Sequence, residues 1–361
     1  MIALAMTATE LLTKRDPESI FSEPNPDTIH AEYHKLAQKW HPDVCKDPKA
    51  DEVLRHINEL RDLAAEHLDK GIWNVSGLLT LNIKHWGDKN ASGTGKNKLQ
   101  IHYIKKHTFE LGDFYICERS IVYVLNSGNE DLIENFIQNV NGFTYTTEKM
   151  KEEMSKYLPH LGSIMKANKP LETQDGHKIL VINKTPDQVL LRDLLDYMPN
   201  LDPKHMAWIV SRLLNIACYL EHKALTYNDF SLDTIYLSPK YHTASILGGW
   251  WYATPSGSRL VAVPKRTLGL LPPSVISSKK ASRRTDLELI RATAREMFKD
   301  LTGFGSLKPI PDPMVEWARF PSAGSAKVDY AFWMSKVLPA AFGKRSFTPL
   351  NVDIEQIYKE K

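Results

Sequence analysis

Few side chains in this sequence have the types and spacing that metal chemistry requires. His30 and His34 lie one helical turn apart and could bind a metal ion together, but no third ligand is evident beside them. The three cysteines are far apart and form no C-x-x-C pair, so they indicate neither a zinc site nor a disulfide framework, and they fit a reducing compartment. They are Cys45, Cys117 and Cys218. We therefore predict no metal site.

A phosphate-binding loop is suggested by the segment 92–96, Ser-Gly-Thr-Gly-Lys, but its spacing is wrong. Asn90 stands where the first glycine of such a loop is needed, and Asn97 follows Lys96 where Ser or Thr would hold magnesium. The surrounding stretch 84–98 is rich in Gly, Ser, Asn and Lys. It is predicted to be a flexible linker between two domains.

The triplet His41-Pro42-Asp43 lies between two stretches with the apolar spacing of amphipathic helices, 25–40 and 47–68. Each stretch begins with a capping residue followed by proline. Pro42 disfavours helix at His41, so the first helix should end there. Two antiparallel helices would bury both apolar stripes and leave the triplet exposed at their tip. An exposed loop stiffened by proline loses little entropy on binding, so it suits contact with another protein.

The segment 33–43, Tyr-His-Lys-Leu-Ala-Gln-Lys-Trp-His-Pro-Asp, resembles the signature of the J-domain family. The segment 16–21 resembles the short opening helix of that family, and 54–59 resembles its second long helix. The resemblance covers the whole domain, which is placed at residues 1–83. It implies a co-chaperone that recruits a DnaK-type chaperone and stimulates its ATPase.

The resemblance also implies which residues bind the chaperone. In the family, the His-Pro-Asp loop and the basic face of the preceding helix contact the chaperone's ATPase domain. The corresponding residues here are His41, Pro42 and Asp43, with Lys35 and Lys39. Lysines on one helix face can steer an acidic partner, although a merely solvated face is the alternative.

Two positions depart from the J-domain pattern. His34 stands where Arg or Lys is common, and Arg61 stands where an aromatic residue is usual. Both departures bear on the affinity for the chaperone more than on the mode of binding.

Beyond the linker, short β-branched runs precede longer helical patterns. The strand candidates are 101–104, 114–117, 120–125 and 178–182. The helix candidates are 207–221 and 286–301. Strands followed by helices predict an α+β domain.

The segment 225–237 resembles the catalytic loop of protein kinases. Tyr227-Asn228-Asp229 holds the place of the family's His-Arg-Asp, and Thr234 stands where Asn should bind magnesium. The segment 244–250 resembles the strand that leads to Asp-Phe-Gly, with Gly249 in the place of the metal-binding Asp.

Further segments resemble other parts of a kinase. The segment 110–117 resembles a Gly-rich loop reduced to one glycine, Gly112, and 120–125 resembles the lysine strand, with Tyr123 where Lys belongs. The segment 271–276 resembles Ala-Pro-Glu without its Glu. Their order predicts a degenerate protein-kinase-like domain at 99–361. The whole chain resembles predicted bacterial and phage J-domain proteins that carry such a domain.

Phosphoryl transfer depends on a Lys, magnesium ions and their Asp and Asn ligands. Because these groups are missing, we expect no enzymatic activity and no cofactor, and we interpret Asp229 as a structural remnant that bonds its own loop. The alternative is an atypical protein kinase that uses Asp229 as base, with the J-domain as a recruitment module. In that case Lys105 or Lys106, on a neighbouring strand, would replace the missing lysine.

The composition is that of a globular protein, with 42% hydrophobic and 25% charged residues. The net charge of +3 gives no argument for nucleic-acid binding. A basic run at 279–284 is interpreted as a solvated loop, with contact to an acidic client or nucleic acid as the alternative. Without a signal peptide or an apolar run of spanning length, we expect no membrane partner and a cytoplasmic protein, in the host cell if phage-encoded.

The sequence thus predicts a multidomain protein in which an all-α J-domain helical hairpin is followed by an α+β protein-kinase-like domain. The first domain should bind a DnaK-type chaperone, and the second should bind a client or another partner protein. The identity of that client is not indicated by the sequence.

Overall fold

The computed structural model describes residues 2–14, 17–22, 25–69, 74–75, 77–84, 98–163, 165, 169–300, 309–344 and 347–358. The phosphate-loop-like segment 92–96 lies outside these residues, as does most of the predicted linker. By its internal packing the chain forms two compact units. Unit 1 comprises Met1–Cys117, Val122–Ser127 and Pro170–Leu180, and unit 2 comprises Glu118–Ile121, Gly128–Lys169 and Val181–Lys361.

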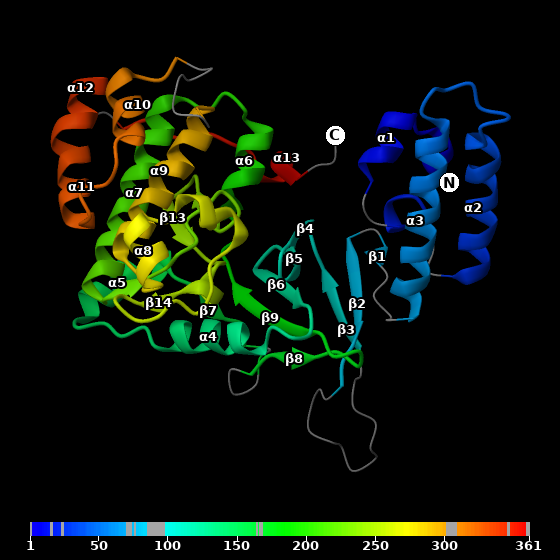
Figure 1. Ribbon diagram of the computed structural model, residues 1–361, viewed down its shortest axis with the longest axis horizontal. Helices are drawn as coiled ribbons and strands as arrows, with labels where there is room; N and C mark the ends of the chain where they lie inside the picture. The colour runs from blue at the N-terminus through cyan, green and yellow to red at the C-terminus, as the bar shows by residue number, and fades with distance from the viewer. Residues whose placement is uncertain are drawn as a thin grey trace, which may run out of the picture. The chain divides into compact units, whose positions relative to one another are not determined.

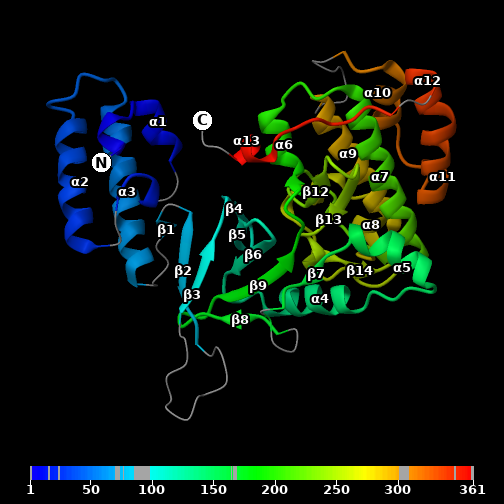
Figure 2. The same cartoon turned by 180° about the vertical axis from the view of Figure 1, so that it is seen from behind.

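Two antiparallel helices dominate the N-terminal region of unit 1. They are α2 (Pro26–Trp40) and α3 (Ala50–Asp69), which lie side by side in Figures 1 and 2. At the start of α2, the Asn25 side chain accepts hydrogen bonds from the backbone N–H groups of Asp27 at 2.9 Å and Thr28 at 3.4 Å. Before α3, Asp47 accepts from Lys49 N–H at 2.9 Å. α2 therefore begins where its cap predicts, whereas α3 begins at Ala50, three residues after the predicted cap Asp47.

Short N-terminal elements complete the core of this helical pair. They are the 3-10 turn η1 (Ile2–Ala5), α1 (Ala8–Thr13) and the 3-10 turn η2 (Pro17–Ser19). Thr7 and Glu10 form a reciprocal capping box at the start of α1, a helix that the sequence analysis did not predict. The opening helix expected at 16–21 is only the turn η2, and Asp16 lies outside the described part of the chain. Leu11, Phe21, Leu36 and Ile57 are among the side chains that pack together and exclude water.

The strands of unit 1 form two sheets. β1 (Asn74–Val75), β2 (Leu78–Asn82) and β3 (Lys98–His102) are antiparallel neighbours, and in β3 Leu99 and Ile101 are buried while alternate residues are exposed. The strand expected at 101–104 is therefore shifted towards the N-terminus. β4 (Lys105–Phe109) and β5 (Gly112–Ile116) form a hairpin, and β6 (Ser120–Leu125) and β9 (Lys178–Asn183) follow in that sheet. The short strand β8 (Leu171–Glu172) pairs with β9.

Unit 2 is mainly helical with short strand pairs. Its helices are α4 (Glu130–Asn141), α5 (Glu148–Met154), α6 (Leu191–Tyr197), α7 (Pro203–His222), α8 (Pro273–Ser278), α9 (Arg283–Phe298), α10 (Asp312–Arg319), α11 (Ala326–Phe332), α12 (Leu338–Phe342) and α13 (Ile354–Tyr358). Its strands are β7 (His160–Leu161), β10 (Val189–Leu190), β11 (Leu225–Thr226), β12 (Ile235–Ser238), β13 (Thr243–Ile246) and β14 (Thr254–Pro255). α7 and α9 pack against each other and bury most of their apolar residues.

The fold class is confirmed in its coarse form: an N-terminal helical region precedes a mixed α/β region with sheets. The helix candidates at 207–221 and 286–301 correspond to α7 and α9. The strand candidates at 120–125 and 178–182 correspond to β6 and β9. None of the helices described is both long and apolar enough to cross a membrane.

Candidate functional site

The turn between α2 and α3 exposes His41, Pro42 and Asp43. The His41 side chain is 51% exposed and that of Asp43 is 87% exposed. The His41 carbonyl accepts from the N–H groups of Val44 at 2.9 Å and Cys45 at 2.8 Å, which closes the turn. His41 Nδ1 accepts from Asp43 N–H at 3.2 Å and lies 3.5 Å from Asp43 Oδ2. The backbone of the turn is thus internally bonded while its side chains face solvent.

Polar contacts join α2 to α3 and to the segment that precedes α2. Tyr33 Oη on α2 donates to Asn58 Oδ1 on α3 at 2.7 Å. The largely buried carboxylate of Glu32 accepts from Ser22 N–H at 2.8 Å and from its hydroxyl at 2.6 Å. Arg61 on α3 places its guanidinium 4.6 Å from the centre of the Tyr33 ring on α2, which is a cation–π contact.

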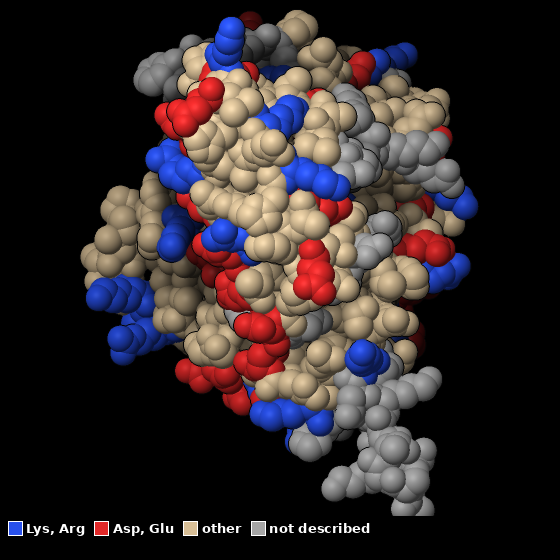
Figure 3. Space-filling view, turned by 90° about the vertical axis from the view of Figure 1, so that its right-hand side faces the viewer, with Lys and Arg blue, Asp and Glu red and all other residues tan. Residues whose placement is uncertain are grey.

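The two lysines predicted to bind the chaperone have different surroundings. Lys39 Nζ donates to the carbonyls of Leu4 at 2.9 Å and Met6 at 3.2 Å, so its charge is partly engaged by the N-terminal segment. Lys35 is exposed on α2. Figure 3 faces the side on which α2 and α3 lie and shows Lys and Arg side chains beside a band of acidic ones. On α3, the exposed acidic residues include Asp51, Glu52, Glu59 and Asp62.

His30 and His34 approach each other on α2, with their Nε2 atoms 3.0 Å apart. Over the described residues, no group of three or more His, Cys, Asp or Glu side chains is arranged to hold a metal ion. In the described part of the chain, no third such side chain joins His30 and His34 to complete a metal site.

In unit 2, Asp229 is buried, with 2% of its side chain exposed, and forms an ion pair with Arg266. Burial alone would lower the pKa of Arg266, but the carboxylates of Asp229 and Asp233 outweigh this and raise it. Arg192 Nη2 in turn contacts Asp233 at 3.0 Å and Glu296 at 3.3 Å. Asp229 thus belongs to a network of alternating charges.

The backbone of the 227–229 segment is held by a second buried carboxylate. Asp286, at the start of α9, accepts from Tyr227 N–H at 2.8 Å and from Asn228 N–H at 2.7 Å. Burial raises the pKa of Asp286 to about 7, although the two N–H bonds oppose this. Asn228 has a positive φ of 66°, and its side chain donates to the Tyr252 carbonyl at 2.8 Å.

Gly249 lies against this same segment with a positive φ of 73°. A Cβ atom there would lie 2.6 Å from Asp229 Oδ2 and closer still to the Tyr227 hydroxyl, which donates to the Gly248 carbonyl at 2.6 Å. Thr234 donates its hydroxyl proton to the Asp229 carbonyl at 2.6 Å. Residues at these positions therefore do not fit a magnesium site of the kinase type, because one has no room for a carboxylate and the other is turned to the backbone.

Two further residues that the sequence analysis compared with kinase positions lie in unit 1. Gly112 has a φ of 145°, and a Cβ there would lie 3.1 Å from the Leu125 Cα and closer to the Val124 carbonyl oxygen, so glycine permits close strand packing. Tyr123 is buried among aromatic rings, 5.8 Å from Phe109 and 5.5 Å from Phe114. Strand packing explains the glycine at Gly112, and aromatic packing explains the position of Tyr123. Neither explanation needs a bound phosphate.

In the alternative of an atypical kinase, a lysine on β4, Lys105 or Lys106, would replace the lysine that kinases use to bind phosphate. Lys106 Nζ lies 3.3 Å from Asp113 Oδ2 on the paired strand β5 and 5.9 Å from the centre of the Tyr115 ring. Lys105, next to it, is half-buried.

The structure brings the predicted site residues together in three places: the turn at 41–43, the surroundings of Asp229, and the strands β5 and β6. The Asp229 side chain bonds Arg266, a residue that the sequence analysis missed, and the Asp229 carbonyl accepts from the Thr234 hydroxyl within its own loop. A comparison with known proteins finds no family model that matches the chain and no similar curated protein.

Proposed function

We propose that this protein is a J-domain co-chaperone that recruits a DnaK-type chaperone and stimulates its ATPase. The observation that carries the proposal is the exposed His41-Pro42-Asp43 turn at the tip of two helices that are bonded to each other. The turn is ordered before it binds, because the His41 carbonyl closes it and Pro42 restricts the backbone. A partner would therefore meet exposed side chains at a small entropic cost.

The helix before the turn offers a basic approach to that partner. Lys35 is exposed on α2, and exposed cations raise the rate at which an acidic partner associates. Lys39 bonds two backbone carbonyls and would contribute less. We expect Lys35→Ala to slow association more than Lys39→Ala does.

The test measures the steady-state ATPase rate of a host-matched DnaK-type chaperone with the full chain added. Stimulation is expected from the wild type and is expected to be lost in His41→Gln. His102→Gln makes the same change at an exposed histidine on β3 and should keep full stimulation. Equal stimulation by wild type and His41→Gln, or none by either, would overturn the proposal.

We further propose that unit 2 transfers no phosphoryl group and instead binds a client or partner protein. Three contacts support this: Asp229 is paired with Arg266, the space beside Gly249 is filled, and the Thr234 hydroxyl is bonded to the backbone. A carboxylate paired with arginine is a weak base, because the neighbouring cation stabilises its ionised form.

Isothermal titration of the full chain with ATP and magnesium tests this second proposal. We expect no binding at physiological ATP concentration, with the DnaK-type chaperone as the positive control. Micromolar binding that Asp229→Asn or Lys106→Ala weakens would assign nucleotide chemistry to this unit and contradict the proposal.

A further inference from the structure

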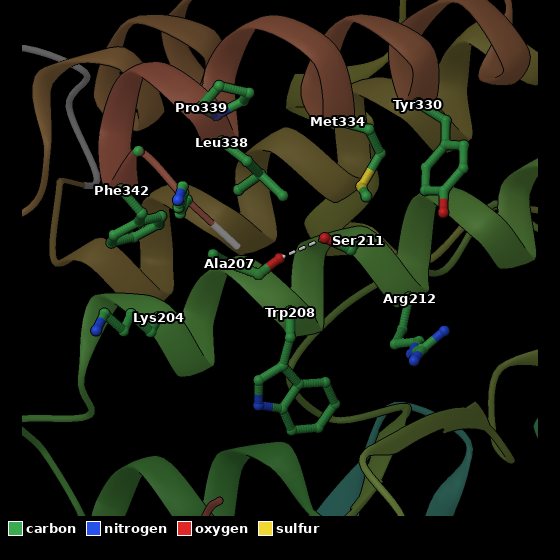
Figure 4. A pocket seen from close by; sticks show the side chains of 12 residues that line it. Lys204, Ala207, Trp208, Ser211, Arg212, Tyr330, Met334, Leu338, Pro339 and Phe342 are labelled. Carbon is green, nitrogen blue, oxygen red and sulfur yellow. Dashed lines mark hydrogen bonds between the residues drawn. The ribbon is translucent and has the colours of Figure 1, made fainter. Parts of the chain in front are cut away.

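A cavity of about 180 Å³ opens in unit 2 between α7 and the helices near the C-terminus. Figure 4 shows Met334 and Leu338 pointing from the C-terminal helices towards Ala207 and Ser211, two small residues on α7. A dry cavity of about 150 Å³ accommodates a benzene molecule, so this one has room for a side chain the size of Leu or Phe.

Cations surround this apolar space. Lys204 and Arg212 lie at the two ends of the α7 segment that lines the cavity (Figure 4), and the Arg212 Nε also donates to the His242 carbonyl at 3.2 Å. Lys344, which follows α12 in the sequence, lines the cavity as well. None of the lining residues that the structure describes is Asp or Glu. The surroundings therefore favour an anionic partner over a cationic one.

The spacing of the cations indicates the size of that partner. Lys204 and Arg212 are eight residues apart on one helix, which corresponds to about 12 Å along its axis. A small monoanion cannot contact both ends at once. A partner helix aligned with α7 matches this distance when its carboxylates lie seven or eight residues apart.

The far wall of the cavity has an unusual backbone. Between α11 and α12 the chain forms a π-helical turn, η7 (Trp333–Val337), which includes Met334. The Trp333 indole N–H donates to Ser211 Oγ at 2.8 Å, and Ser211 in turn donates to the Ala207 carbonyl at 2.8 Å. This chain of bonds ties the π-helical wall to α7, so the cavity is held open rather than collapsed. Such single-turn π-helices are frequent at functional sites.

We propose that this groove binds an acidic amphipathic helix of a partner protein. An apolar side chain of the partner enters between Leu338 and Ala207, and carboxylates on either side of it meet Lys204 and Arg212. Amphipathic helices bind apolar grooves in this manner by side chains at helical spacing. This inference rests on the proposal that unit 2 binds a partner protein. It adds where the partner binds and what chemical character the partner has.

Fluorescence anisotropy of the full chain with labelled helical peptides tests the inference. The acidic probe carries leucines at i and i+4, flanked by glutamates eight residues apart, and the basic probe replaces those glutamates with lysines. We expect the acidic probe to bind at least tenfold more tightly than the basic one. The Lys204→Glu/Lys344→Glu variant should lose the acidic probe and gain the basic one. The matched control, Lys149→Glu/Lys169→Glu, reverses two exposed cations that do not line the cavity and should keep the wild-type preference.

Equal binding of both probes, no binding of the acidic probe, or an unchanged preference in Lys204→Glu/Lys344→Glu would overturn the groove assignment. Leu338→Trp is a second variant, which should abolish binding of the acidic probe by filling the cavity without changing its charge. Stimulation of the chaperone ATPase is measured in parallel. Because that activity depends on the turn at 41–43, its presence or absence separates failure of this inference from failure of the co-chaperone proposal.

Discussion

Gly249 combines a positive φ with close contacts on its Cβ side, so a substitution there meets two separate penalties. A left-handed backbone costs a residue with a side chain roughly 1–2 kcal/mol. Overpacking against the buried Tyr227 hydroxyl and Asp229 carboxylate adds about 1–3 kcal/mol. We predict that Gly249→Ala lowers the free energy of unfolding by the sum of the two, as measured by chemical denaturation.

Gly257 provides the control for this prediction. Its φ is also positive, at 86°, but a Cβ there would meet nothing within 4 Å. Gly257→Ala should therefore show only the backbone penalty. If both variants lose the same stability, the contacts beside Gly249 are not what excludes a side chain.

Asp286 should give the stability of the protein a distinctive pH dependence. Its pKa is raised from 3.8 to about 7, mainly by burial, so the folded protein keeps a proton that the unfolded chain has already lost. The stabilisation is fully present below about pH 4 and is lost as pH rises through about 7, by at most about 1.4 kcal/mol per pH unit. Asp286→Asn removes this proton, so its loss of stability relative to wild type should be larger at pH 5 than at pH 8.

The same comparison distinguishes the two electrostatic effects on Asp286. If the N–H bonds from Tyr227 and Asn228 outweighed burial, the carboxylate would be ionised in the folded state. The stability difference between wild type and Asp286→Asn would then be the same at pH 5 and pH 8, because both lie above the ordinary pKa of 3.8. Denaturation curves at the two pH values decide between these outcomes.

Arg266 illustrates what could not be predicted at the scale of residues. The positions of Asp229, Thr234 and Gly249 could be proposed because each belongs to a short local pattern. Arg266 is 37 residues from Asp229 and belongs to no such pattern, so only the folded chain brings the two charges together. Its position bears on how Asp229 is interpreted, because the ion pair adds a partner that is distant in sequence to the bond that Asp229 makes within its loop.

At the scale of elements, long amphipathic helices were predictable and short ones were not. α2, α3, α7 and α9 each carry an apolar stripe through at least four turns, and the caps of α2, α7 and α9 mark where they begin. α1 has only six residues, too few to establish a period. α4 was missed although Ile133, Phe136 and Val140 are buried at helical spacing, a signal that the sequence already contained.

The pairing of α2 with α3 is the element-scale feature on which the proposed chaperone contact depends. Tyr33→Phe removes the hydrogen bond to Asn58 without changing the shape of the ring. We expect a loss of about 0.5–1.5 kcal/mol, because a single hydrogen bond contributes about that much. Native-state hydrogen exchange should show it as faster exchange of the α2 and α3 amides.

Tyr241→Phe is the matched control, since Tyr241 is 63% exposed in unit 2. It should leave exchange in α2 and α3 unchanged. Unaltered exchange in Tyr33→Phe would mean that apolar packing alone holds the two helices together.

At the scale of the whole molecule, the order of a helical region and a mixed α/β region followed from the sequence because periodicity changes along the chain. The residue bounds of the two compact units could not be predicted from the sequence. Unit 1 takes in residues 122–127 and 170–180, which are distant in sequence from its helices, because β6 and β9 each contribute residues to both units. The predicted domain boundaries at 83 and 99 stay predictions, and β2 lies before the first of them.

The two proposed binding functions use residues that belong to different units, which leads to a prediction about the whole chain. The turn at 41–43 lies in unit 1, and the groove beside α7 lies in unit 2. Surface substitutions usually change stability by no more than about 0.5 kcal/mol, so variants at either place should leave the other unit folded. We therefore expect His41→Gln to lose ATPase stimulation while keeping wild-type affinity for the acidic peptide.

The reciprocal variant should show the opposite pattern. Lys204→Glu/Lys344→Glu is expected to lose the peptide and retain full stimulation of the chaperone. If the peptide instead altered the affinity of the wild-type chain for the chaperone, the two sites would be energetically coupled, and the chaperone would have to alter the affinity for the peptide by the same factor. Measuring peptide affinity with and without the chaperone, in the same nucleotide state, therefore distinguishes two independent binding units from a coupled one.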